Sequence, residues 1–204
     1  MNPYAPKRTM PVGRLDYKSK QHPSLRWFYT TSYPMLEYGE EEFIYDIPVL
    51  VGPGAYLVFG DGFGGSSILL ALGLKHRGLH GRVFAVDTYT FNKNHMQNVR
   101  ASYERHGVAD DISQFHGTTE TVGTQFLHEG LEFKFILVDA SHAYKDVKSD
   151  AQIAMPMVAP GGQIAFHDTN QEGVDQAMQE TILADPTWEQ TYWINRLKMF
   201  KRKP

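Results

Sequence analysis

Short apolar segments alternate with longer amphipathic segments along most of this chain of 204 residues. Apolar runs that end at glycine or aspartate are typical of buried strands, and apolar residues spaced three and four apart indicate helices. The predicted strands are residues 55–59, 82–87, 112–116, 133–139 and 163–167. The predicted helices are residues 68–75, 94–106, 119–129, 145–155 and 174–184. Two β-rich segments, residues 188–194 and 197–203, are joined by a short turn and predict a terminal hairpin.

This order of elements predicts an α/β fold. Strands that alternate with helices form a mostly parallel sheet with helices on both faces. Together with the hairpin, the pattern predicts a Rossmann-like, seven-stranded, mostly parallel sheet that ends in an antiparallel hairpin, and we expect this domain to span residues 50–204. Ligands of such sheets bind beyond the carboxyl ends of the strands, so the residues that directly follow each strand are the candidates for function.

The first part of the chain, residues 1–49, is predicted to form an N-terminal arm and a helical cap. Residues 1–23 are rich in proline, lysine and polar residues, which is typical of a loose arm. Residues 24–49 are rich in aromatic residues, which indicates one or two helices packed on the core. The alternative is a cap over a binding site, because Tyr and Trp suit surfaces that are half apolar and half wet. An aromatic-rich arm could also pack on a second copy of the chain in a homo-oligomer.

Composition and charge narrow the class of protein. The chain has 42% hydrophobic and 21% charged residues, which is ordinary for a globular protein. Its net charge of -3 argues against binding through phosphate neutralisation, so we expect no nucleic-acid partner. The absence of cysteine excludes disulfides, thiolate metal sites and cysteine nucleophiles. The N-terminus lacks a signal-peptide pattern and the longest apolar stretch is too short for a bilayer span, so we expect a cytoplasmic protein without a membrane partner.

A glycine-rich turn follows the strand predicted at residues 55–59. It reads Gly60-Asp61-Gly62-Phe63-Gly64-Gly65 and matches the pattern Gly-x-Gly-x-x-Gly. Glycines allow positive φ angles and a close approach of the backbone to a ligand. Asp87 ends the next predicted strand, where a carboxylate can accept hydrogen bonds from both ribose hydroxyls of an adenine nucleoside. Turn and acid together predict an adenosine-type cofactor. The alternatives are that the glycine-rich segment is only a structural tight turn and that Asp87 is only a helix N-cap.

Two motifs in the second half of the chain narrow the type of cofactor. Asp139-x-x-His142-x-Tyr144 follows one predicted strand, and Pro160-Gly161-Gly162 precedes a strand that ends in His167-Asp168. In these motifs the chain resembles class I S-adenosylmethionine-dependent methyltransferases. More narrowly, it resembles the O-methyltransferase branch that includes the macrocin and sugar O-methyltransferases and the cephalosporin-hydroxylase-like proteins. It resembles the catechol-type enzymes more distantly. The resemblance covers residues 50–204 and implies methylation of a small hydroxylated acceptor.

The resemblance implies a place for each part of the cofactor S-adenosylmethionine. The glycine turn would face the methionine portion, whose carboxylate would lie at a helix N-terminus. The acid after the second strand would hold the ribose, and residues after the second and third strands would border the adenine. The implied cofactor-binding residues are Gly60, Asp61, Gly62, Ser66, Asp87, Thr88, Thr118 and Asp139.

The resemblance also implies a site for Mg²⁺ or another divalent cation. Asp139 and Asp168 match positions that bind the metal in the metal-dependent branch. Thr169 or Asn170 could complete the site, although this branch has a carboxylate or amide directly after Asp168. His142 falls where catechol-type relatives place a basic residue over the acceptor hydroxyl, so His142 and Asp139 are the candidate catalytic residues. We interpret His167 as structural, because the side chain before Asp168 on a strand should point to the opposite face.

One departure from the methyltransferase pattern leaves other functions open. Val58 replaces the acid that methyltransferases commonly have two residues before the first glycine, so the cofactor's ammonium would rely on backbone carbonyls or Asp61. This loss also suits a hydroxylase-like or non-catalytic relative with the same fold. A third alternative is an NAD(P)-dependent oxidoreductase, because Tyr144-x-x-x-Lys148 matches the dyad of short-chain dehydrogenases. The dyad's spacing from the glycine turn and from Ser141 disfavours that alternative.

Overall fold

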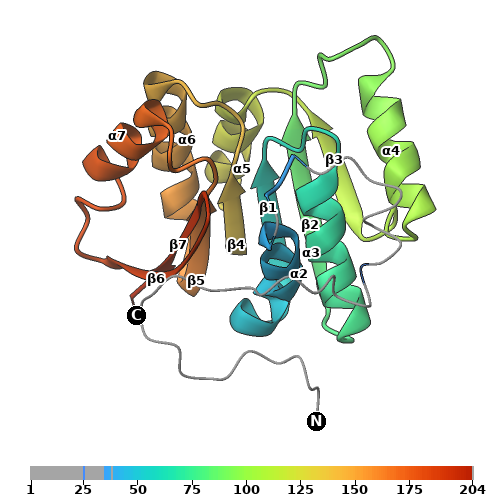
Figure 1. Ribbon diagram of the computed structural model, residues 1–204, viewed down its shortest axis with the longest axis horizontal. Helices are drawn as coiled ribbons and strands as arrows, with labels where there is room; N and C mark the ends of the chain where they lie inside the picture. The colour runs from blue at the N-terminus through green and yellow to red at the C-terminus, as the bar shows by residue number, and fades with distance from the viewer. Residues whose placement is uncertain (1–24, 26–34, 38, 204) are drawn as a thin grey trace.

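The structure, a computed structural model, describes residues 25, 35–37 and 39–203 and is built on a seven-stranded sheet (Figure 1). The strands are β1 (Gly54–Phe59), β2 (Gly81–Asp87), β3 (Ile112–His116), β4 (Phe133–Val138), β5 (Val158–Phe166), β6 (Trp188–Ile194) and β7 (Leu197–Arg202). Their order in the sheet is β3-β2-β1-β4-β5-β7-β6. The first five strands are parallel, and β7 is antiparallel to both β5 and β6. The predicted Rossmann-like sheet with a C-terminal antiparallel hairpin is therefore confirmed.

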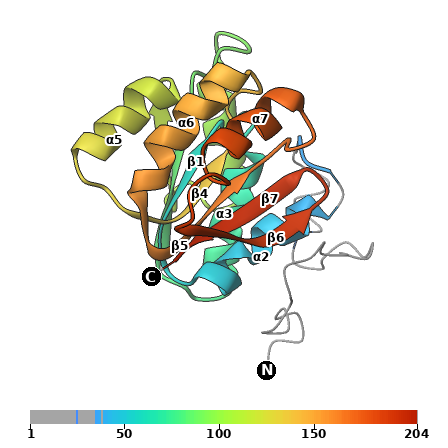
Figure 2. The ribbon, with the colours of Figure 1, turned by 90° about the vertical axis from the view of Figure 1, so that its left-hand side faces the viewer.

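Helices cover both faces of the sheet and enclose two hydrophobic cores (Figure 2). One face carries α2 (Glu40–Val51), α3 (Gly65–His76) and α4 (His95–Arg105). The other carries η2 (Thr119–Gly123), α5 (Thr124–His128), α6 (Tyr144–Met157) and α7 (Glu172–Glu180). No helix among the described residues is long and apolar enough to cross a membrane.

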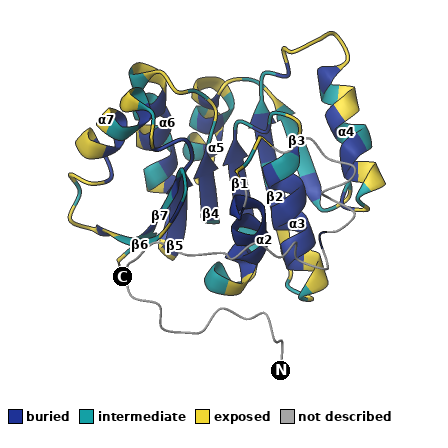
Figure 3. Ribbon diagram, in the orientation of Figure 1, coloured by how far each residue is buried: buried dark blue, intermediate teal, exposed yellow. Residues whose placement is uncertain are grey.

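The central strands are largely buried on both faces, which explains their mostly apolar sequences. Along β1, Tyr56 and Val58 belong to one core, whereas Leu57 and Phe59 belong to the other. All four side chains are fully buried, and Figure 3 shows that the neighbouring strand β4 is mostly buried too. The carboxyl ends of these strands are therefore held rigidly side by side, and the residues that follow them share one edge of the sheet.

The predicted elements are present, with differences at some boundaries. The segment predicted as one helix, residues 119–129, is a π-helical turn, η2, followed by α5. The helix predicted to end before Pro156 continues to Met157, with the proline in its last turn. The fifth strand begins at Val158 instead of residue 163, and its register with β4 shifts near Phe133.

Helix α2 crosses the predicted boundary between the cap and the domain. Phe43, Ile44 and Ile47 are fully buried, and α2 packs against α3. The contact is close at Gly73 of α3, where an added Cβ atom would lie 2.3 Å from the backbone oxygen of Tyr45. Part of the predicted cap is therefore built into the core. The predicted arm, residues 1–23, lies outside the described residues.

Candidate active site

Two adjoining cavities open at the carboxyl ends of the parallel strands. Their volumes are about 300 Å³ for the first cavity and about 390 Å³ for the second. Gly60, Asp87 and Ala140, which follow or end β1, β2 and β4, line both cavities. The first cavity extends from these residues toward η2 and α6, and the second extends toward the end of β5 and the β6–β7 turn.

The turn between β1 and α3 forms one hydrogen-bonded unit with the acid at the end of β2. At Gly60, with φ +87°, an added Cβ atom would lie 2.1 Å from the backbone oxygen of Asp139, so only glycine fits. The N–H of Gly62 donates a hydrogen bond of 2.9 Å to Asp87 Oδ2. Asp87 Oδ1 accepts a second one, of 2.6 Å, from the N–H of Tyr89. The structure thus brings together the turn and the acid that the sequence singled out.

Asp61 lines the second cavity, but its carboxylate is buried beneath the turn. It accepts hydrogen bonds from the hydroxyls of Ser67 at 2.6 Å, Tyr89 at 3.0 Å and Tyr103. Burial raises the pKa of Asp61 to about 6, although these hydrogen bonds act in the opposite direction. The side chain therefore supports the turn from α3 and α4, and its predicted contact with the cofactor stays a prediction.

Asp61→Asn should change how stability depends on pH. The pKa of Asp61 is about 6 in the folded state against an ordinary 3.8, so its contribution to stability is complete below pH 3.8 and is lost as the pH rises through 6. Relative to the asparagine variant, the wild type should lose about 2 kcal/mol of unfolding free energy between about pH 4.5 and about pH 7.5. Urea unfolding at the two pH values measures this, with the exposed Asp110→Asn as the baseline. A difference that stays constant with pH would contradict the prediction.

The first cavity has more acidic side chains than the sequence analysis identified. Thr88 and Thr118 line it, and their contacts with the cofactor stay predictions. Thr118 also caps η2, because its hydroxyl accepts a hydrogen bond of 3.1 Å from the N–H of Thr121. The acids that line the same cavity are Glu120, Asp146 and Asp150. Asp150 is buried, and burial raises its pKa to about 6.

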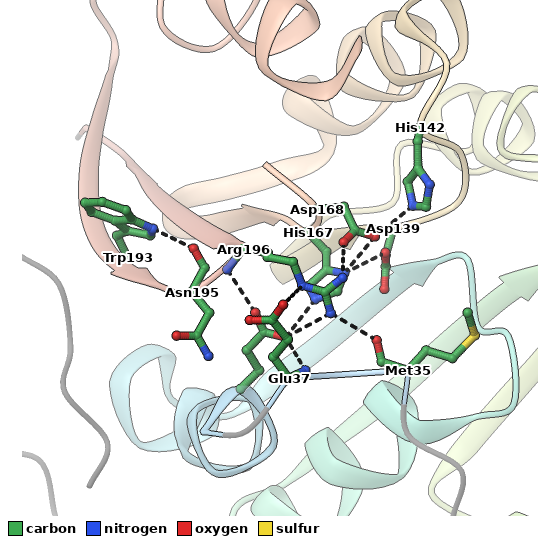
Figure 4. Close-up of polar contacts among 10 residues, drawn as sticks. Met35, Glu37, Asp139, His142, His167, Asp168, Trp193, Asn195 and Arg196 are labelled. Atoms are coloured by element: carbon green, nitrogen blue, oxygen red, sulfur yellow. Dashed lines mark hydrogen bonds and ion pairs between the residues drawn. The ribbon is translucent and has the colours of Figure 1, made fainter. Parts of the chain in front are cut away.

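Asp139, His142 and Asp168 meet in the second cavity (Figure 4). His142 Nε2 lies 2.8 Å from Asp168 Oδ2, and one ligand atom of each of the three residues lies within 4.8 Å of the others. Asp168 is buried, whereas His142 is exposed. A hydrogen bond from His167 holds the pKa of Asp168 below its ordinary value, against the opposing effect of burial. Asp139, His142 and Asp168, three of the predicted catalytic and metal-binding residues, are therefore close enough to act on one ligand.

His167 belongs to this cluster, so its interpretation as a residue of the opposite face is wrong. Strand β5 ends at Phe166 and Asp168 has φ +51°, so the alternation of strand side chains no longer applies. His167 Nδ1 lies 3.1 Å from Asp139 Oδ1 and 3.4 Å from Asp168 Oδ2. Its Nε2 lies 3.0 Å from Glu40 Oε2, at the start of α2. Both ring nitrogens therefore face carboxylates.

These contacts make His167 a buried cation between acids. Burial alone would lower its pKa, but hydrogen bonds to the three surrounding carboxylates raise the pKa of His167 to about 12. Glu40 is fully buried, which would raise its pKa, but the hydrogen bond from His167 and those from two backbone N–H groups bring its pKa below the ordinary value. The pair ties α2 to the end of β5 and holds the cluster in one arrangement.

Arg196, in the β6–β7 turn, completes the cluster and was not identified from the sequence. Its Nη1 lies 2.6 Å from Asp168 Oδ1, and its Nε lies 3.0 Å from Glu37 Oε1. Its backbone N–H donates a hydrogen bond of 3.0 Å to Glu40 Oε1. A basic residue in a predicted hairpin turn was the only sequence signal. The sheet order, in which β7 lies beside β5, is what brings this turn to Asp168.

Ser66 and Thr169, two other predicted site residues, differ in position. Ser66 lies in the first turn of α3 and lines the second cavity, and its predicted contact with the cofactor's carboxylate stays a prediction. Thr169 is buried, and its backbone N–H donates a hydrogen bond of 2.9 Å to the carbonyl of Arg196. It is not among the described residues that line the second cavity. The role of Thr169 as a metal ligand stays a prediction.

The Tyr-x-x-x-Lys pair of the dehydrogenase alternative lies outside both cavities. Lys148 Nζ donates hydrogen bonds to the Tyr144 hydroxyl at 2.9 Å and to Glu180 Oε2 at 2.7 Å, which join α6 to α7. Ser141 donates a hydrogen bond to Asp146 instead, at 2.8 Å. This pair is therefore a contact between two helices, and the described residues give no support to a dehydrogenase dyad.

Residues 57–169 match the protein family described as a methyltransferase domain. The matched segment begins in β1 and includes the glycine turn, Asp87 and the cluster up to Asp168. A comparison with curated protein sequences finds no match.

Solved structures with a similar fold include several methyltransferases. An O-methyltransferase from Bacillus cereus in complex with SAH has a TM-score of 0.70 and 20% identity, and the alignment covers 92% of this chain and 94% of that chain. The O-methyltransferase TomG from Streptomyces achromogenes in complex with SAM has a TM-score of 0.66, 16% identity and coverages of 89% and 86%. A methyltransferase from Geobacter sulfurreducens has a TM-score of 0.67, 12% identity and coverages of 91% and 91%. At these identities the likeness shows the shared fold.

Proposed function

The chain belongs to the methyltransferase domain family, and we propose that it transfers the methyl group of S-adenosylmethionine to a hydroxyl oxygen of a small acceptor. The observation that carries this proposal is the position of the unit formed by Gly62 and Asp87. It lies where the two cavities meet, and the second cavity ends at Asp139, His142 and Asp168. A nucleoside and an acceptor hydroxyl would thus have adjacent places.

Turnover assays test the proposal directly. The purified protein is incubated with S-adenosylmethionine and a panel of hydroxylated compounds, and S-adenosylhomocysteine and the methylated product are measured by mass spectrometry. We expect both products in equal amounts for at least one acceptor. Methyl transfer to nitrogen acceptors alone would contradict O-methylation while leaving the cofactor assignment intact.

The cofactor would occupy both cavities. Its adenine would lie in the first cavity and its methionine portion along the glycine turn, with the carboxylate near Ser66 at the N-terminus of α3. Each oxygen of Asp87 already accepts one backbone N–H and keeps a lone pair for a ribose hydroxyl. The carboxylate of Asp61 is engaged by three hydroxyls, so the ammonium would rely on backbone carbonyls.

The reaction requires that the acceptor hydroxyl lose a proton. Methyl transfer is an in-line displacement at a sulfonium carbon, so positioning and the exclusion of water contribute much of the acceleration. His142 would donate its Nε2–H to Asp168, 2.8 Å away, and take the acceptor's proton at Nδ1. Asp168 would orient the ring and stabilise the imidazolium that forms, as the carboxylate does in other Asp–His pairs.

The donor atoms of the second cavity fit a divalent cation. The carboxylates of Asp139 and Asp168 place ligand atoms within 4.8 Å of one another, and such oxygens bind Mg²⁺, Mn²⁺ or related ions. Asp139 and Asp168 would hold the ion, which when bound would lower the pKa of the acceptor hydroxyl. His167, hydrogen-bonded between these carboxylates and Glu40, would keep them oriented.

His142→Gln should lower kcat about 100-fold, because general base catalysis commonly contributes at least that factor. Binding of S-adenosylhomocysteine and of the cation should change little, since neither is assigned to His142. Steady-state kinetics and calorimetry measure the two effects, with the exposed His128→Gln as the matched control. A wild-type kcat would show that His142 is not the base, and a loss of cation binding would make it a ligand instead.

A further inference from the structure

The backbone of Arg196 is fixed in the β6–β7 turn by hydrogen bonds on both sides. The preceding residue, Asn195, has φ +44°, and its carbonyl accepts a hydrogen bond of 2.8 Å from the indole N–H of Trp193 (Figure 4). The N–H of Arg196 donates to Glu40 Oε1 at 3.0 Å, and its carbonyl accepts from the N–H of Thr169 at 2.9 Å. The side chain of Arg196 therefore starts from a defined position between α2 and the segment that follows β5.

The guanidinium of Arg196 joins two segments that are far apart in the sequence. Its Nη1 lies 2.6 Å from Asp168 Oδ1, directly after β5. Its Nε lies 3.0 Å from Glu37 Oε1, and its Nη2 donates a hydrogen bond of 3.4 Å to the carbonyl of Met35. The planar group has five N–H donors in a fixed arrangement, so one arginine can hold several acceptors at once. Arg196 therefore bridges the segment before α2, residues 35–37, and the acid after β5.

The segment before α2 forms part of the wall of the second cavity. Met35 and Leu36 line this cavity together with Arg196. Leu36 is half-buried against the core, whereas Met35 is 66% exposed and Glu37 is exposed as well. Besides the contacts with Arg196, the segment is held by a hydrogen bond of 2.7 Å from the N–H of Glu37 to Glu40 Oε2. Polar contacts therefore contribute much of what keeps this wall in place.

Arg196 also determines which oxygen of Asp168 faces the rest of the site. Arg196 holds Oδ1, whereas Oδ2 lies 2.8 Å from His142 Nε2 and 3.4 Å from His167 Nδ1. Asp168 and Glu40 are buried, so loss of the guanidinium would leave negative charge less compensated and would release Oδ1 of Asp168. The contact with Arg196 thus keeps Oδ2 directed at the proposed base.

On the basis of the proposed function, we propose that Arg196 is a positioning residue for methyl transfer. It fixes the carboxylate of Asp168 so that Oδ2 orients His142, and it holds residues 35–37 as a wall of the second cavity. The two contacts have separable consequences. The contact with Asp168 acts on the chemical step and therefore on kcat, whereas the contact with Glu37 acts on binding of the acceptor and therefore on KM.

Kinetics of matched variants separate the two contacts, with S-adenosylmethionine and the acceptor of the panel that has the highest turnover. Glu37→Gln should raise KM for this acceptor about fivefold with little change in kcat. Arg196→Gln should raise KM to the same extent and also lower kcat at least about tenfold, because Asp168 loses its orientation. Arg196→Lys keeps the charge beside Asp168 but lacks the planar group, so it should restore most of kcat and leave KM raised.

A double variant shows whether the two residues act as one unit. If Arg196 holds the wall through Glu37, Glu37→Gln should raise KM no further when Arg196→Gln is already present. Arg82→Gln is the matched control, because Arg82 is exposed at the start of β2 and bonds to Ser113 and to the carbonyl of Asp110. It should leave kcat and KM unchanged. Additive effects on KM, wild-type kinetics in Arg196→Gln, or an equal loss of kcat in Arg196→Lys and Arg196→Gln would each overturn the inference.

Hydrogen exchange tests the contact with the wall without an acceptor. In the free full-length chain, Arg196→Gln should speed exchange of the backbone N–H of Glu37 at least about tenfold, whereas Arg82→Gln should not. An unchanged rate would overturn the inference. Calorimetry with S-adenosylhomocysteine separates this failure from that of the proposed function. Wild-type affinity in Arg196→Gln shows that the fold and the cofactor site are intact, whereas absence of binding to the wild type would overturn the proposed function.

Discussion

Asp87→Ala is expected to weaken binding of S-adenosylmethionine and S-adenosylhomocysteine by about three orders of magnitude. The change removes two hydrogen bonds from ribose hydroxyls to a charged group, each contributing about 1.5–3 kcal/mol. It also removes the acceptor for the N–H groups of Gly62 and Tyr89, so the glycine turn loses its attachment to the end of β2. Isothermal titration calorimetry with S-adenosylhomocysteine measures the loss.

Two comparisons make this result specific to the site. Asp110→Ala removes an exposed aspartate just before β3, away from the strand ends that carry the site, and should leave the affinity unchanged. Thermal unfolding of Asp87→Ala shows whether the fold is retained. An affinity equal to that of the wild type in a folded variant would remove Asp87 from the cofactor site.

Asp168→Asn is expected to lower kcat by about three orders of magnitude while S-adenosylhomocysteine still binds. Asparagine preserves the shape of the side chain but removes the charge that meets His142, His167 and Arg196. The proposed base would lose the group that orients it, and the proposed cation would lose one of its two carboxylates. Steady-state kinetics and calorimetry on the same preparation measure the two quantities.

Chelation separates the two roles of Asp168. If the cation is required, EDTA should abolish wild-type turnover and added Mg²⁺ or Mn²⁺ should restore it. Full activity in EDTA, with Asp168→Asn still inactive, would show that the reaction needs no cation. The proposed role of the His142–Asp168 pair would then be retained. Asp175→Asn serves as the control and should keep wild-type kinetics. Asp175 lies on α7 and is paired with Lys198 of β7.

The parts of the fold that the sequence predicts well are those with strong local signals. The strands β1 and β4 are mostly buried on both faces, so their sequences are apolar except for Lys134 and their ends are clear. Because parallel strands end at one edge, Asp87, Asp139 and Asp168 could be placed together before the structure was known. The boundaries that differ, at Pro156 and Val158, lie where apolar burial extends an element past a residue that usually ends it.

The residues that the sequence analysis missed reach the site through contacts between distant segments. Glu40 lies at the start of α2 and Arg196 in the β6–β7 turn, and neither position carries a local signal of function. Their places follow from the packing of α2 and from the insertion of β7 beside β5. The prediction for His167 fails for a different reason, because strand alternation does not extend beyond the last residue of β5. The left-handed conformation of Asp168 ends that alternation.

The most direct test of the central claim, that this chain uses S-adenosylmethionine, is calorimetry of the wild-type protein with S-adenosylhomocysteine and, separately, with NADH. Both ligands contain an adenosine that Asp87 and the glycine turn could hold, so the comparison isolates the remainder of the cofactor. We predict saturable binding of S-adenosylhomocysteine at one site per chain and no binding of NADH. Binding of NADH without a response to S-adenosylhomocysteine would contradict the account.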